Sequence, residues 1–184
     1  MELGLPVKDI LYREISKITE KKIQIEISKN KSSKIISEII SKCIPKITQI
    51  SHNMDEDLGI LAESLMHFLL TIAIIPSQRK VSLGNLEIDI VIPDLKTLQK
   101  NPKDSLIIIF PKTNNKELIQ KKITGLEKIQ TVKENIWIVL TNNLKFKNKT
   151  FIINNDKKSL NGILDEVSEF YSSRKQTKFK IIKS

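Results

Sequence analysis

The stretch of sequence that decides the fold contains LEIDIV at residues 86–91 and LIIIFPKT at residues 106–113. The second segment begins with a continuous apolar run, Leu106 to Phe110, which is typical of a strand buried on both faces of a sheet. The first segment alternates polar and apolar residues and follows Gly84-Asn85, a pair that favours a tight turn. We therefore predict a β-hairpin over residues 79–92, followed by a central strand.

On either side of this stretch, apolar spacing predicts further helices and strands. The expected elements are a helix at 55–74 capped by Asp55, a polar loop at 93–105, a helix at 118–129, strands at 136–140 and 149–153, and a closing helix at 160–171. Helices that alternate with a mixed sheet predict a layered α/β domain with helices on both faces of the sheet.

The first fifty residues have a mainly helical pattern. Apolar side chains recur at helical spacing from Val7 to Ile18. The alternating isoleucines at positions 23, 25 and 27 instead predict a short strand. Ser33 is the expected cap of a second helix, which we expect to end near Pro45.

Composition limits the classes of protein that this chain can represent. One cysteine, Cys43, excludes an internal disulfide, and only two histidines argue against a histidine-rich metal site. The start of the chain has Glu2 and no apolar h-region, so we expect no signal peptide and a cytoplasmic location. The apolar segment 58–75 has Glu63 and His67 in its middle, which favours a buried core helix over a membrane span.

The net charge of +10 indicates a polyanionic partner, with nucleic acid first and an acidic protein second. The last forty residues hold ten basic and four acidic side chains, so the charge is unevenly distributed. An abundance of Lys, Ile and Asn is also typical of an AT-rich coding sequence, which leaves mutational bias as a second explanation of the charge.

Four segments in order, GILAE at 59–63, QR at 78–79, LEIDIV at 86–91 and LIIIFPKT at 106–113, resemble the PD-(D/E)xK nuclease superfamily. The similarity is greatest to its small, archaeal Holliday-junction-resolvase-like members and covers about residues 55–140. It implies a restriction-endonuclease-like three-layer core with a mixed central sheet and helices on both faces.

The resemblance also implies a division of the chain. We expect a mainly helical N-terminal extension at residues 1–50, the restriction-endonuclease-like domain at residues 51–173 and a basic tail at residues 174–184. Resolvase-like proteins often form dimers, and the N-terminal helices could supply the interface of a homodimer.

The resemblance assigns roles to three residues: Asp89 matches a metal-binding aspartate, Lys112 a catalytic lysine and Glu63 a helix glutamate. Phosphodiester hydrolysis at such a site uses Mg²⁺, which prefers carboxylate and water oxygens. Phe110 stands where the family places its second metal-binding acid. Because phenylalanine cannot ligate a metal, we expect Mg²⁺ binding to be severely weakened. Glu87 is a possible substitute ligand, since residues two apart on a strand share a face.

Basic and amide side chains complete the set of candidate site residues. The expected nucleic-acid contacts are Arg79, Lys80, Gln120, Arg174, Lys175, Lys178 and Lys180. Those of the tail lie on both sides of Phe179, and basic residues with interleaved aromatics can hold phosphates and stack on unpaired bases.

Three functions are consistent with these features. The first is a nucleic-acid-binding protein of nuclease descent, with DNA the favoured ligand, that is catalytically weak or inactive. The second is an active endonuclease or resolvase that uses Mg²⁺, Glu87 and Asp89. The third is a protein-interaction module of the kind that binds transcription factors, on an analogy of fold alone. Metal-dependent cleavage that is lost in Asp89→Ala would distinguish the second function from the others.

Overall fold

The central sheet has five strands, and all of them lie in the part of the chain that the structure describes. The structure is a computed structural model that describes the backbone of residues 5–153 and 159–181 and the side chains of residues 6–153 and 159–174. The strands are β1 (Gln78–Leu83), β2 (Leu86–Ile92), β3 (Leu106–Ile109), β4 (Ile136–Leu140) and β5 (Lys149–Ile152). They lie side by side in chain order, with β1, β2 and β3 antiparallel and β3, β4 and β5 parallel.

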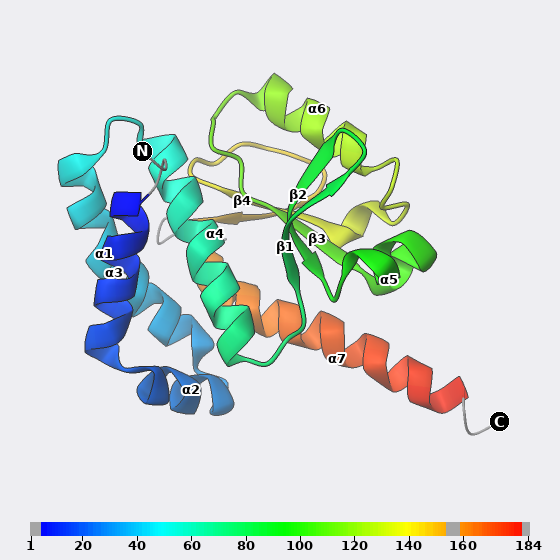
Figure 1. Ribbon diagram of the computed structural model, residues 1–184, viewed down its shortest axis with the longest axis horizontal. Coiled ribbons are helices and arrows are strands. Elements are labelled where there is room, and N and C mark those ends of the chain that lie inside the picture. The colour runs from blue at the N-terminus through cyan, green and yellow to red at the C-terminus, as the bar shows by residue number, and fades with distance from the viewer. Residues whose placement is uncertain (1–4, 154–158, 182–184) are drawn as a thin grey trace.

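Helices cover both faces of this mixed sheet (Figure 1). One side holds α1 (Leu5–Ile18), α2 (Glu20–Ser28), α3 (Ser32–Ile50), α4 (Met54–Ile72) and α7 (Ile163–Ile181). The other side holds α5 (Leu95–Lys100) and α6 (Lys116–Leu126). The predicted fold class, a three-layer α/β core with helices on both faces and a helical N-terminal region, is confirmed.

Strand β3 is the centre of the core. All four of its side chains are buried, and they alternate between the two sides of the sheet as the pleat requires. Leu106 and Ile108 pack on the α4 side, while Ile107 and Ile109 pack on the α6 side. The run is continuously apolar because both faces of the strand are covered.

The predicted hairpin is confirmed, and Gly84 adopts the positive φ of 60° at its turn. The predicted loop at residues 93–105 is wrong, because it contains α5. The Asp94 side chain accepts the N–H of Thr97 at 2.7 Å and so caps this short helix, which buries Leu98. One buried leucine is too weak a periodic signal to predict a helix from sequence.

The strand predicted at residues 23–27 is also wrong, since these residues lie in α2. Thr19 accepts the N–H of Lys22 at the start of this helix. Of the three isoleucines only Ile23 is fully buried, and Ile25 is 40% exposed. The alternation therefore does not mark a strand with one covered face.

Two helix limits differ from the predictions. Helix α3 continues through Pro45 to Ile50, because Ile47 in its last turns is buried against the core. It begins without the predicted Ser33 cap: the neighbouring Ser32 hydroxyl instead donates to Asp165 of α7 at 2.6 Å. Proline removes only one helical hydrogen bond, a loss that packing can offset.

Two further limits differ near the ends of the domain. Asn53, not Asp55, caps α4 by accepting the N–H of Glu56. Helix α7 begins at Ile163, after a 3₁₀ turn at Leu160–Gly162, and reaches Ile181. It therefore includes most of the segment expected to be a basic tail.

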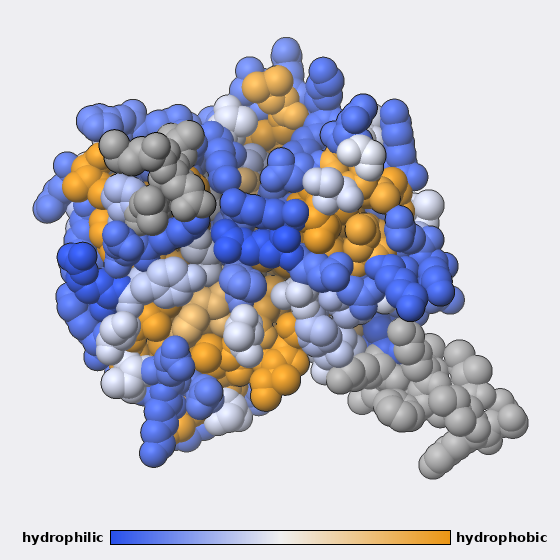
Figure 2. All heavy atoms as spheres, viewed as in Figure 1, coloured by the Kyte–Doolittle hydropathy of each residue, from blue (hydrophilic) through white to orange (hydrophobic). Residues whose placement is uncertain are grey.

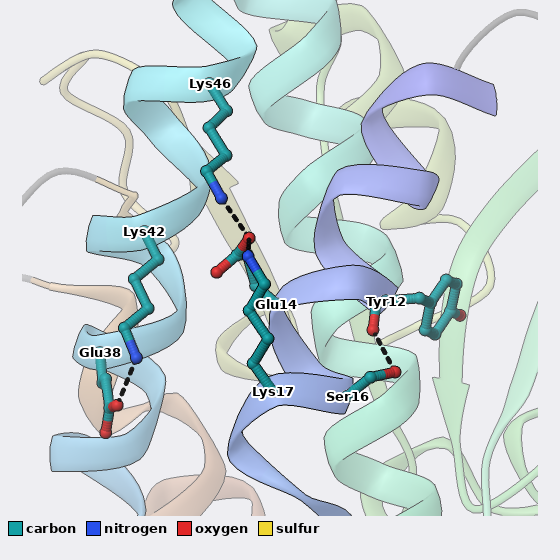
Figure 3. Close-up of polar contacts among 7 residues, drawn as sticks. All are labelled: Tyr12, Glu14, Ser16, Lys17, Glu38, Lys42 and Lys46. Carbon is teal, nitrogen blue, oxygen red and sulfur yellow. Dashed lines mark hydrogen bonds and ion pairs between the residues drawn. The ribbon is translucent and has the colours of Figure 1, made fainter.

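The N-terminal helices share one core cluster with α4 and the sheet, and a buried carboxylate joins two of them. Glu14 of α1 accepts hydrogen bonds from Lys17 at 2.8 Å and from Lys46 of α3 (Figure 3). These bonds lower the pKa of Glu14 below its ordinary value. The boundary expected at residue 50 stays a prediction.

The surface around the end of α4 is apolar (Figure 2). Ile74, just after this helix, is 87% exposed and has a φ of 56°. In the described part of the chain, no helix is both long enough and apolar enough to cross a membrane. The segment weighed as a membrane span forms α4, whose side chains fill the core as predicted.

Candidate functional site

Glu63 lies in the middle of α4 with its side chain 3% exposed, and it is paired with two cations. Arg79 of β1 donates from Nε to Oε1 at 2.9 Å, and the Lys112 ammonium lies 3.5 Å from Oε2. A buried carboxylate is tolerated only with such partners. The structure therefore brings Glu63 and Lys112 together, as the resemblance implied, and adds Arg79 to the pair.

Gly59, one turn before Glu63, allows this helix to lie against the end of β3. A Cβ atom at this position would stand 3.1 Å from the carbonyl oxygen of Pro111 and 3.2 Å from Cγ of Lys112. Both distances are shorter than a relaxed contact between these atoms. The glycine of the GILAE segment thus serves the close approach of α4 to Lys112.

Asp89 of β2 is the second carboxylate of the site, and its side chain is 14% exposed. It accepts the backbone N–H of Phe110 at 2.8 Å, and the ammonium of Lys122 lies 3.0 Å from each of its two oxygens. Burial raises the pKa of Asp89 above its ordinary value, and the nearby Glu63 carboxylate adds to the rise. Lys122 and the N–H of Phe110 oppose it by favouring the charged form.

The strand pairing is irregular beside Asp89. Arg79 pairs with Ile90 and Val81 pairs with Ile88, but the ladder skips Lys80 and Asp89 between them. Lys80 has a φ of 51°. Ile88 packs on the α6 side of the sheet, whereas Ile90 packs on the α4 side. Regular alternation, on which the shared face of Glu87 and Asp89 was predicted, is therefore interrupted here, and Asp89 reaches a lysine of α6.

Phe110, which the resemblance aligned with a metal-binding acid, fills the core. Its side chain is 2% exposed and packs on the α4 side of the sheet. Glu87, the proposed substitute ligand, is exposed and lines a groove with Lys121 and Lys122. Among the described residues, no three His, Cys, Asp or Glu side chains lie close enough together to hold a metal ion.

The donor set at this site does not fit Mg²⁺. The carboxylates of Glu63 and Asp89 already have lysine or arginine partners, and Mg²⁺ needs free carboxylate and water oxygens in near-octahedral geometry. The expected metal-ligand roles of Asp89 and Glu87, and the catalytic roles of Lys112 and Glu63, stay predictions.

Two residues of the site were missed by the sequence analysis. His67 lies one turn after Glu63, and burial and the charge of Arg79 lower its pKa. Lys122 is the other. Because it lies three residues after buried Ile119 and one before buried Ile123, it flanks the apolar stripe of α6. Position beside that stripe was the only available signal that Lys122 points toward the sheet.

Lysines surround the outer surface of α6. One groove beside the hairpin is lined by Lys121, Lys122 and Lys128, and a second beside the β4–β5 connection is lined by Lys116, Lys133, Lys145 and Lys147. Gln120, a predicted nucleic-acid contact, lines both grooves. The same surface carries Leu118, which is 57% exposed.

The other predicted contacts are spread over the molecule. Lys80 is exposed on β1, and Arg79 is engaged with Glu63. Arg174 of α7 lies over the ring of Phe170, with its guanidinium carbon 5.2 Å from the ring centroid. The side chains of the remaining three, Lys175, Lys178 and Lys180, lie outside those that the structure describes.

The comparison with known proteins found similarity to solved structures. No protein-family model and no curated protein matches the sequence. The restriction endonuclease PspGI, solved in a complex with substrate DNA, aligns with a TM-score of 0.56 over 91% of this chain and 93% of its own, at 12% identity. Metal-depleted Ecl18kI, solved with uncleaved DNA, gives 0.48 over 94% of this chain and 66% of its own, at 16% identity. The PspGI alignment, over nearly the whole of both chains, shows that the chain has a restriction-endonuclease-like fold.

Proposed function

We propose that the chain is a DNA-binding protein of nuclease descent whose metal-dependent site is inactive. The observation that carries the proposal is the pairing of Asp89 with Lys122, next to a buried Phe110 in place of an acid. A nuclease of this kind needs carboxylates that converge on a cation. Here the carboxylates of Glu63 and Asp89 are paired with lysine and arginine side chains instead.

The lysine-lined grooves support DNA binding. Lysines that neutralise phosphates release counterions, which makes binding favourable and sensitive to salt. The seven lysines of the two grooves face only two acidic side chains there, Glu87 and Glu127. The fold neighbour PspGI was solved with its substrate DNA, which makes DNA the first polyanion to test.

The alternative of an active endonuclease has weaker support. Glu87 would have to replace the missing acid, but it faces Lys121, Lys122 and Lys128 in its groove. An acidic protein partner, a homodimer and a cytoplasmic location remain predictions.

A binding titration tests the proposal. Fluorescence anisotropy with labelled duplex, single-stranded and four-way-junction DNA would be measured at two salt concentrations. We expect binding to at least one of these and a fall in affinity with salt, by about tenfold or more for a fourfold rise if several phosphates are contacted. Absence of binding to every DNA at low salt would contradict the proposal and favour an acidic protein as the partner.

A further inference from the structure

The environment of Asp89 is that of a carboxylate already bound to a cation. The Lys122 ammonium is 3.0 Å from both oxygens, and the N–H of Phe110 occupies a further acceptor site at 2.8 Å. The Asp89 side chain is only 14% exposed, so water has little access to it. A divalent ion at this carboxylate would have to compete with these two donors for its oxygen lone pairs.

We propose that the Lys122 ammonium supplies at Asp89, permanently, the positive charge that a divalent cation supplies in a metal-dependent nuclease. This inference deepens the proposed function and rests on its inactive site. If Lys122 supplies this charge, a phosphate group can approach the site without any bound metal.

The charges of the site support this consequence. Glu63 and Asp89 contribute two negative charges, and Arg79, Lys112 and Lys122 contribute three positive charges through direct pairs. The group therefore carries a net charge of +1. A cluster of unpaired acids repels a phosphodiester until metal binds, whereas a group with net positive charge attracts it.

The same charges work against a metal ion. A dication placed on Asp89 would first have to displace Lys122. It would then lie close to an ammonium that has lost its partner, and like charges at such distances repel strongly in a partly buried site. Glu63 offers no relief, because its carboxylate is held by Arg79 and Lys112.

Direct measurement of Mn²⁺ binding to the protein without DNA tests the proposal. Bound Mn²⁺ would be quantified from the loss of the free-ion signal in electron paramagnetic resonance, and the midpoint of thermal unfolding would be followed in parallel. Wild type should bind Mn²⁺ no more tightly than Asp89→Asn. Lys122→Met should bind it at least about tenfold more tightly than wild type and gain thermal stability on Mn²⁺ addition.

Controls separate a local from a general effect of charge. Lys96→Met removes one positive charge from an exposed position of α5 and should leave Mn²⁺ binding at the wild-type level. The gain in Lys122→Met should disappear in Lys122→Met/Asp89→Asn. Lys122→Gln serves as a second variant if Lys122→Met does not fold, since an amide can still donate to Asp89 without the charge.

Two results would overturn the proposal. One is Mn²⁺ binding by wild type that is lost in Asp89→Asn, because the metal would then displace Lys122 readily. The other is a folded Lys122 variant that gains no Mn²⁺ binding. Neither result depends on DNA, so a failure here is distinguishable from a failure of the proposed DNA binding.

Discussion

The guanidinium of Arg79 donates to Oε1 of Glu63 at 2.9 Å, and this contact joins the edge strand β1 to the buried helix α4. It ties the hairpin that carries Asp89 to the helix that packs against Lys112. The ion pair therefore holds the part of the site that contains Asp89 next to the part that contains Lys112.

Replacing Glu63 with glutamine should destabilise the protein by about 2 kcal/mol. The change leaves two cations without a charged partner, although the partial exposure of Arg79 and Lys112 reduces the loss below that of a fully buried pair. Urea denaturation measures the difference. Glu87→Gln, at an exposed position of the adjacent hairpin, should change stability by less than about 0.5 kcal/mol. Equal effects of the two changes would contradict the role given to Glu63.

The contribution of Glu14 should depend on pH. Its pKa is lowered in the folded protein, so its stabilisation is fully present above the ordinary glutamate pKa and is lost as pH falls through the folded-state value. We expect Glu14→Gln to cost about 1 kcal/mol at pH 7 and the difference from wild type to shrink toward pH 3. Denaturant unfolding at a series of pH values measures it.

Glu38 provides the comparison for that experiment. It forms an ion pair with Lys42 (Figure 3), and both side chains are partly exposed. Glu38→Gln should therefore cost less than Glu14→Gln at pH 7. A loss for Glu14→Gln that is the same at every pH would show that the carboxylate charge is not responsible.

The folded protein should be more stable with glycine at position 80 than with alanine there. The φ of 51° at Lys80 is accessible to glycine without strain but costs a residue with a Cβ about 1 kcal/mol. We expect Lys80→Gly to exceed Lys80→Ala in free energy of unfolding by about this amount. In α5 the order should reverse, since Lys96→Gly places glycine in a helix. The same order at both positions would contradict the left-handed backbone at Lys80.

Charge reversal in the groove beside the hairpin should weaken DNA binding. Lys121→Glu/Lys128→Glu removes two exposed lysines from that groove, whereas Lys96→Glu/Lys100→Glu makes the same change in charge on exposed positions of α5. The first variant should lower both the affinity and the salt dependence, by about one unit of slope for each lost phosphate contact. Equal losses in both variants would indicate a general charge effect instead of a binding groove.

The elements of the fold that could be predicted are those whose residue pattern follows directly from which of their faces are buried. A strand covered on both faces must be apolar throughout, so β3 and β4 were evident in the sequence. Helix α2 was not, because the alternating isoleucines have strand periodicity and only packing against the neighbouring helices selects the helix.

The candidate site was predictable in its residue types but not in its pairings. The resemblance singled out Glu63, Asp89 and Lys112, and their functional roles stay predictions. Lys122 was not identified, because its contact with Asp89 spans 33 residues and depends on the irregular backbone of the hairpin. No local pattern encodes that irregularity, since lysine at a positive φ is uncommon and unfavourable.

The most direct test of the central claim is a cleavage measurement under conditions in which DNA binding is complete. Wild type and Asp89→Ala would be incubated with end-labelled duplex and four-way-junction DNA and with Mg²⁺ or Mn²⁺, after a gel shift has shown saturation. We expect both proteins to bind the DNA and leave it uncut. Metal-dependent cleavage by wild type that is lost in Asp89→Ala would contradict this expectation and establish an active nuclease.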